Sequence, residues 1–107
     1  MLEERIHLGR LFRQYAPLLT DRQRFVLGRY LEGDLSLAEI GESLSISRQG
    51  AYDLMRRASG TLEHWEERLS FCQRLEEVGR RLRPALTDPV VALSIEDRAF
   101  VEDFFGV

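Results

Sequence analysis

The chain has 107 residues, of which 44% are apolar and 31% are charged, with a formal net charge of −3 and one cysteine. This composition is typical of a small ordered protein, and it excludes a membrane-spanning segment because no apolar run approaches the roughly 20 residues that such a helix needs. One cysteine excludes an internal disulfide, and the net charge argues against nonspecific polyanion binding as the main activity.

The first two predicted elements are amphipathic helices. Residues 3–15 place apolar side chains near a 3.6-residue period, and Pro17 ends this element. A second helix begins after Thr20, which has the spacing of a capping box with Gln23. We expect Gly33 to end this second helix in a left-handed turn.

A short third helix and a long fourth one follow. Ser36 and Glu39 repeat the capping-box spacing, and Ser47 is placed to cap the next helix. From Arg48 to Arg83 there is no proline, so the helical pattern continues for a long distance. We expect a bend at Gly60, where a separate fifth helix begins.

The last part of the chain is acidic. Pro84 and Pro89 are predicted to break the helical pattern, and Ser94 to cap a short tail helix with several acids and an apolar face. This helix either packs on the rest of the chain, binds a partner or covers the arginines of the preceding helices. Since no strand is predicted, the fold class is all-α: a helix-turn-helix domain (1–58), a long amphipathic helix (59–83) and an acidic tail (84–107).

Residues 37–57 have the pattern of a helix-turn-helix. Such a hairpin needs a small residue where its two helices cross, a tight turn, and apolar residues that fix the angle. Gly41 is the small residue, Leu44 and Ile46 flank the turn, and Ala51 and Leu54 anchor the second helix. The spacing predicts that the Arg48 end of the second helix projects into solvent.

A projecting helix start offers side chains and backbone amides to nucleic acid. Arg48 and Gln49 can make bidentate contacts to guanine and adenine, while Arg56 and Arg57 can hold phosphates. The full set of candidate nucleic-acid-binding residues is Ser47, Arg48, Gln49, Tyr52, Arg56 and Arg57. The alternative is a structural hairpin with ordinary surface arginines, and the nearby acids Glu39, Glu42 and Asp53 favour it.

An apolar stripe after the motif is a candidate dimer surface, because a single helix-turn-helix buries little area on DNA. The predicted interface residues are Leu62, Trp65, Leu69, Cys72 and Leu75. From Leu62 to Leu82 the average step is nearer 3.3 than 3.5 residues, so a strict coiled-coil heptad fails. Packing of the stripe on the chain's own helices is the alternative.

The segment LLTDRQRFVLGRYLEGDLSLAEIGESLSISRQGAYDLMRRAS resembles region 4 of bacterial sigma factors, which reads a promoter element. With SRQGAYD and RRASGTLEHWEERL, it is more similar to the YlxM family of small helix-turn-helix proteins from Gram-positive bacteria. The resemblance implies a DNA-binding protein whose family genes lie beside that of the signal recognition particle GTPase. In that family Ala and Val are expected where this chain has Gly50 and Ala51, which loosens the recognition helix.

Two functions of different classes follow. One is a DNA-binding regulator that acts as a homodimer; the other is an interaction module that binds a protein or an RNA, such as the signal recognition particle GTPase and its RNA. An enzyme is disfavoured, since no phosphate loop, nucleophile with a nearby base or metal cluster is visible. We therefore expect a cytoplasmic, non-enzymatic protein without a metal or another cofactor.

Overall fold

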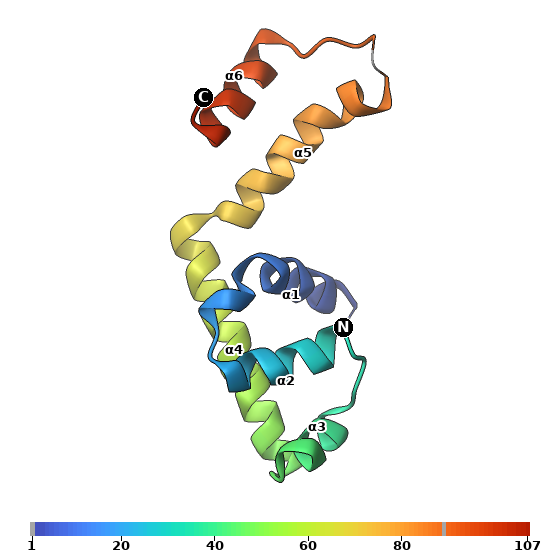
Figure 1. The fold of residues 1–107 in the computed structure, drawn as a ribbon, viewed down its shortest axis with the longest axis vertical. Coiled ribbons are helices and arrows are strands. Elements are labelled where there is room, and N and C mark those ends of the chain that lie inside the picture. The colour runs from blue at the N-terminus through green and yellow to red at the C-terminus, as the bar shows by residue number, and fades with distance from the viewer. Residues whose placement is uncertain (1, 89) are drawn as a thin grey trace. The chain divides into compact units, whose positions relative to one another are not determined.

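The computed structural model describes residues 2–88 and 90–107, in which it contains six α-helices, one 3-10 helix and no strand. In chain order the elements are α1 (Leu2–Tyr15), η1 (Ala16–Leu18), α2 (Asp21–Leu31), α3 (Leu37–Leu44), α4 (Arg48–Leu69), α5 (Phe71–Thr87) and α6 (Ile95–Phe105) (Figure 1). The predicted all-α fold is confirmed. None of the helices in these ranges combines the length and apolar character that crossing a membrane requires.

Polar caps start the helices where the sequence predicts them. The Thr20 hydroxyl accepts a hydrogen bond from the Gln23 amide, and the Gln23 side chain accepts one from the Thr20 amide, both at 3.1 Å. Ser36 and Glu39 form the same reciprocal pair at the start of α3. Ser94 begins α6 with a single such bond. Each cap satisfies backbone N–H groups that the first turn of a helix leaves unpaired.

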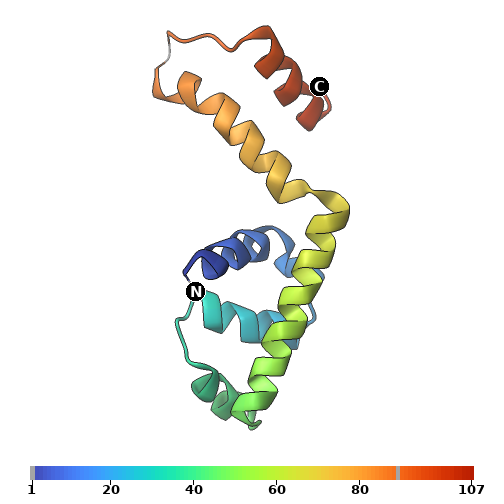
Figure 2. The same cartoon turned by 180° about the vertical axis from the view of Figure 1, so that it is seen from behind.

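The chain divides into two compact units, Met1–Leu69 and Ser70–Val107. In the first unit, α4 packs against α1, α2 and α3, as the view from behind makes clear (Figure 2). The buried apolar side chains of this unit are Leu8, Leu11, Phe12, Tyr15, Leu19, Val26, Leu27, Ile40, Ala51, Ala58 and Leu62. Burial of a large aliphatic or aromatic side chain contributes about 1.5–3 kcal/mol, so this core holds α4 firmly.

Polar contacts also tie α1 to α4. His7 Nε2 lies 2.6 Å from Glu63 Oε1, and the Tyr15 hydroxyl donates to Glu66 Oε1 at 2.6 Å. Two carboxylates of α4 are therefore engaged within the unit.

The turn after α2 differs from the prediction. Gly33 does not adopt a left-handed conformation, whereas Asp34 does, with φ of 54°. The left-handed residue therefore lies one position later than expected, and the Leu35 amide donates to the Arg29 carbonyl at 3.1 Å. Asp tolerates this conformation better than most residues with a side chain.

The bend expected at Gly60 is wrong. α4 runs through Gly60 without interruption to Leu69, and the break falls at Ser70, which has a left-handed φ of 51°. A single glycine weakens a helix by about 1 kcal/mol, which the packing of α4 on three other helices offsets. The three segments 1–58, 59–83 and 84–107 remain a prediction about function, and they do not coincide with the two compact units.

The break expected at Pro84 is also wrong, because α5 contains Pro84 and continues to Thr87. Only one turn follows the proline, and its own carbonyl accepts from the Asp88 amide at 3.0 Å. The Thr87 hydroxyl adds bonds to the carbonyls of Arg83 and Pro84. Pro89, the second predicted break, lies outside the described residues.

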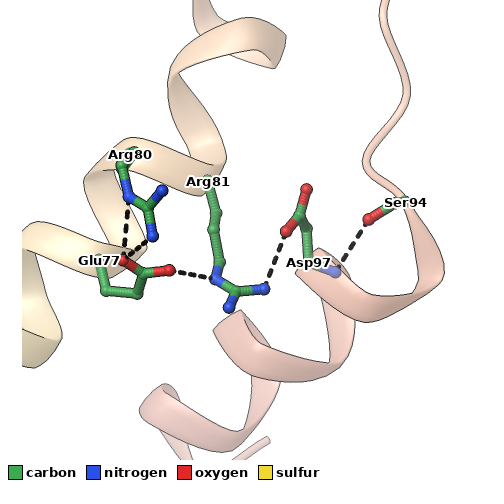
Figure 3. A network of polar contacts seen from close by, with 5 residues as sticks. All are labelled: Glu77, Arg80, Arg81, Ser94 and Asp97. Carbon is green, nitrogen blue, oxygen red and sulfur yellow. Dashed lines mark hydrogen bonds and ion pairs between the residues drawn. The ribbon is translucent and has the colours of Figure 1, made fainter.

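The second unit is a hairpin in which α6 packs on α5. Arg81 joins the two helices: Nε donates to Glu77 Oε1 at 2.8 Å, and Nη1 donates to Asp97 Oδ1 at 2.9 Å (Figure 3). Arg80 also bonds Glu77, and these hydrogen bonds, with that from Arg80 the larger cause, lower the pKa of the Glu77 carboxyl below its ordinary value of 4.5. The arginines of α5 also lie on aromatic rings of α6, Arg81 on Phe100 and Arg74 on Phe104.

Candidate nucleic-acid interface

The hairpin depends on a close backbone approach at Gly41. A Cβ atom built on Gly41 would lie 2.8 Å from the Ile46 carbonyl oxygen and 3.0 Å from that of Ser47. Real Cβ atoms essentially never come within 3.0 Å of another heavy atom. Only glycine therefore lets α3 approach the turn this closely, which confirms the predicted role of Gly41.

The turn itself uses a strained residue. Ser45 ends α3 with a left-handed φ of 58°, and its amide bonds back to the Glu42 carbonyl at 3.2 Å. The Ile46 amide bonds to the Gly41 carbonyl at 2.9 Å. These two bonds satisfy the end of α3 and reverse the chain within a few residues. A side chain in the left-handed region costs about 1–2 kcal/mol, so the surrounding contacts hold Ser45 in place.

An apolar cluster fixes the angle between α3 and α4. Its fully buried members are Val26, Ile40 and Ala51, one from each of α2, α3 and α4. The partly buried side chains packed around them are Phe25, Tyr30, Leu35, Leu37, Leu44, Ile46, Leu54 and Met55. The predicted anchors of the hairpin all belong to this cluster. Ala51, where the family pattern favours a larger residue, is fully buried.

The start of α4 is exposed, as predicted. The Ser47 hydroxyl accepts a hydrogen bond from the Gly50 amide at 2.9 Å and caps the helix. Ser47, Arg48 and Gln49 are all exposed side chains. The first turn of α4, which the structure describes in full, contains no acidic residue. The positive end of the helix dipole therefore faces solvent, where it favours an anion.

The remaining candidates extend this surface along α4. At 3.6 residues per turn, Arg48, Tyr52 and Arg56 form one row, while Gln49, Asp53 and Arg57 form the neighbouring row. Arg56 and Arg57 are exposed, and Tyr52 is partly buried. Eight residues of helix span about 12 Å, which is similar to the width of the DNA major groove. We call these two rows the α4 face.

Two contacts order side chains within the α4 face. Gln49 Nε2 donates to Asp53 Oδ1 at 3.1 Å, so the acid holds the amide of a predicted base-reading residue. The Arg56 guanidinium lies 6.0 Å from the centre of the Tyr52 ring. Asp53 is repulsive to a phosphate at long range, but this hydrogen bond gives it a positioning role that its charge alone does not suggest.

The predicted dimer stripe is divided between the two compact units. Leu62 is fully buried in the first unit and Cys72 is buried in the second, with the break at Ser70 between them. Trp65 and Leu75 are partly buried, and Leu69 is half exposed. A periodic sequence shows which side of a helix is apolar, but not which part of the chain covers it. Leu62 and Cys72 therefore each lie in the interior of their own unit, and dimerisation through the five positions remains a prediction.

No local pattern in the sequence indicates the groove that lies beside the α4 face. Tyr52 and Arg56 are among its lining residues, together with Arg5 of α1, Tyr30 of α2 and the acids Glu4 and Glu63. The volume of the groove is about 540 Å³. Arg5 donates to the Tyr30 carbonyl at 2.9 Å and lies 4.6 Å from the centre of its ring. Arg5 adds a cation near the recognition helix. Only the tertiary fold brings it there, since 47 positions separate it from Tyr52.

Residues 2–98 match the model of the family described as "UPF0122: Putative helix-turn-helix protein, YlxM / p13 like". The chain belongs to this family. The match covers the α4 face and all of α5, so the resemblance predicted from the hairpin residues is confirmed.

Several UPF0122 proteins are clear relatives. One from Thermoanaerobacter sp. (strain X514) is 46% identical over 72 residues, which are 67% of this chain and 62% of the relative. One from Clostridium kluyveri is 44% identical over 77 residues, or 72% of this chain and 69% of the relative. One from Bacillus cereus (strain AH187) is 42% identical over 77 residues, or 72% and 70%. The chain thus spans less than two thirds of the length of the Thermoanaerobacter protein.

Proposed function

We propose that this UPF0122 protein is a DNA-binding regulator that inserts the N-terminal half of α4 into the major groove. The observation that carries the proposal is the exposed, capped start of α4 held outward by the Gly41 contact. Backbone amides and two rows of polar side chains are presented there together. The protein acts without catalysis, through contacts to bases and phosphates.

Each polar residue of the α4 face has a role in this proposal. Ser47 caps the helix and brings its amides to a phosphate. Arg48 contacts guanine, and Gln49 contacts adenine from the orientation that Asp53 fixes. Arg56 and Arg57, about two turns further on, hold the phosphate backbone. Tyr52 supports the Arg56 guanidinium.

The test combines site selection with a salt titration. Selection from a random duplex pool should enrich one sequence. Arg48→Ala should weaken binding to that sequence by about 1–3 kcal/mol and reduce the base preference at one position of it. Arg57→Ala should weaken all duplexes alike and reduce the salt slope by about 0.9. Arg98→Ala, an exposed arginine of α6, is the matched control and should change neither. Equal weak binding to every duplex, unchanged by Arg48→Ala, contradicts the proposal.

A second candidate is an interaction module for a protein or an RNA, such as the signal recognition particle GTPase and its RNA. The exposed acids Glu39 and Glu42 on α3 favour it, because they lie in the helix next to the recognition helix. The Glu39 carboxylate already accepts a hydrogen bond from the Ser36 amide, so the Glu42 carboxylate opposes DNA binding more strongly. Glu42→Gln should raise DNA affinity if α3 lies near the backbone. A drop in affinity for the GTPase–RNA particle, with DNA affinity unchanged, supports the module instead.

A further inference from the structure

A heptad repeat becomes visible in α5 once the helix is known to restart after Ser70. The apolar and small residues Leu75, Gly79, Leu82 and Leu86 follow one another at steps of four, three and four. Over Leu62–Leu82 no such repeat holds, because the break at Ser70 changes the register. We call these four residues the α5 stripe. A 3.5-residue repeat of this kind is the pattern by which one helix packs along another.

The ring contacts between α5 and α6 do not involve the α5 stripe. Contacts to α6 come from Phe71, Arg74 and Arg81, whose side chains lie on Phe104 or Phe100. At 100° per residue, the α5 stripe is centred about a quarter turn away from these positions. α6 therefore leaves the α5 stripe partly open.

Exposure within the α5 stripe supports this conclusion. Leu86 is 78% exposed, and a Cβ built on Gly79 would meet no atom within 4 Å. Leu75 and Leu82 are mostly buried, so the open part of the α5 stripe is Gly79 and Leu86. Because Gly79 has no side chain, it leaves a hollow in a pair of facing helices that accepts a large side chain from the other helix.

The second unit also lacks a core of its own. Among its described residues, the buried side chains are Cys72 and Val78, and α6 contributes none. The unit covers residues 70–107, and chains below about 40 residues usually need a metal, disulfides or oligomerisation to be stable. A further helix packed on the α5 stripe would add to this burial.

We propose that the occupant of the α5 stripe is the α5 stripe of a second copy of this chain, packed antiparallel. In this arrangement Leu82 of each copy fills the hollow at Gly79 of the other, and Leu75 packs on Leu86. All four positions are used, and large side chains face the small one. The two contacts are related by a two-fold axis, as in most homodimers.

Charge complementarity selects the second copy and the antiparallel direction. The exposed residues beside the α5 stripe at the same heptad position are Glu76 and Arg83. In an antiparallel pair these positions face each other, so Glu76 of each copy meets Arg83 of its partner, twice in the dimer. A parallel pair separates these residues by a full heptad and brings neither contact.

This inference rests on the proposed DNA-binding function, for which the dimer would supply a second α4 face, but the dimer forms without DNA. Sedimentation velocity of the full chain alone therefore tests it separately. We expect a monomer–dimer equilibrium between low and high micromolar concentration, abolished by Leu86→Glu. Ile95→Glu changes another exposed aliphatic residue of this unit, outside the α5 stripe, and should leave the equilibrium unchanged.

A charge exchange tests the direction of packing. Glu76→Arg and Arg83→Glu should each weaken dimerisation about tenfold, because each places two like-charged pairs at the interface. The double variant, with the charges exchanged, should restore the native value. Far-ultraviolet circular dichroism of each variant reports whether the hairpin remains folded. A native chain that stays monomeric, or single variants whose losses add in the double variant, overturns the proposal.

Discussion

Replacement of Gly41 by alanine is the sharpest perturbation of the hairpin. The added methyl would lie 2.8 and 3.0 Å from two carbonyl oxygens and 3.2 Å from the Ser47 carbonyl carbon. All three are backbone atoms, so the turn must open by several tenths of an ångström. Overpacking of this kind costs about 1–3 kcal/mol, from which the better helix propensity of alanine recovers about 1 kcal/mol. Because backbone atoms cannot move aside as a flexible side chain can, the overpacking cost should lie in the upper half of that range, about 2–3 kcal/mol, and the net loss should be about 1–2 kcal/mol.

Gly60→Ala provides the matched control. Gly60 also lies inside a helix, but a Cβ there would meet no atom within 4 Å. The same exchange should therefore stabilise the protein by about 0.5–1 kcal/mol. Urea unfolding followed by the fluorescence of Trp65, the single tryptophan, reports on the unit that contains both glycines. A Gly41→Ala variant as stable as the native chain would refute the close crossing.

Three further predictions follow from single contacts. Ser45→Gly should stabilise the first unit by about 0.5–1 kcal/mol in the same assay, because glycine adopts the left-handed conformation without strain; a loss of stability would contradict this. Asp53→Asn should keep the acceptor for Gln49 while removing a negative charge, so anisotropy titrations should show DNA affinity rising severalfold with the base preference unchanged. Because the pKa of Glu77 is lowered in the folded state, its ion pairs stabilise the α5–α6 hairpin fully above pH 4.5, and this contribution is lost as the pH falls below that value. In the Glu77→Gln variant, the nuclear magnetic resonance signals of the Phe100 ring should show weaker packing at neutral pH, and they should change less than those of the native chain on acidification. If the Phe100 signals of the variant and the native chain change identically with pH, Glu77 does not cause the acid sensitivity.

Local signals predicted most of the fold. The capping residues Thr20, Ser36, Ser47 and Ser94 begin their helices as expected, because a cap acts over only three residues. Gly41 was also predictable, since the hairpin spacing allows only a small residue there. The exposure of Arg48 and Gln49 followed from the same geometry.

The features that the sequence did not predict depend on contacts between residues far apart in the chain, or on which of several residues breaks a helix. His7 meets Glu63 across 56 positions, and no local pattern indicates such a pair. Ser70 rather than Gly60 breaks the long helix, because tertiary packing outweighs the weak preference of one glycine. Periodicity showed that Leu62 lies on an apolar face, but not that its own unit covers it.

The most direct test of the DNA-binding role is chemical-shift mapping of the isotope-labelled full chain with the duplex that selection enriches. The largest changes in amide chemical shift are predicted for Ser47 to Arg57, and the amides of α6 should not shift. With a scrambled duplex, the amides of Ser47 to Arg57 should not shift either. Shifts confined to other helices, or equal shifts with both duplexes, would contradict sequence reading by the start of α4.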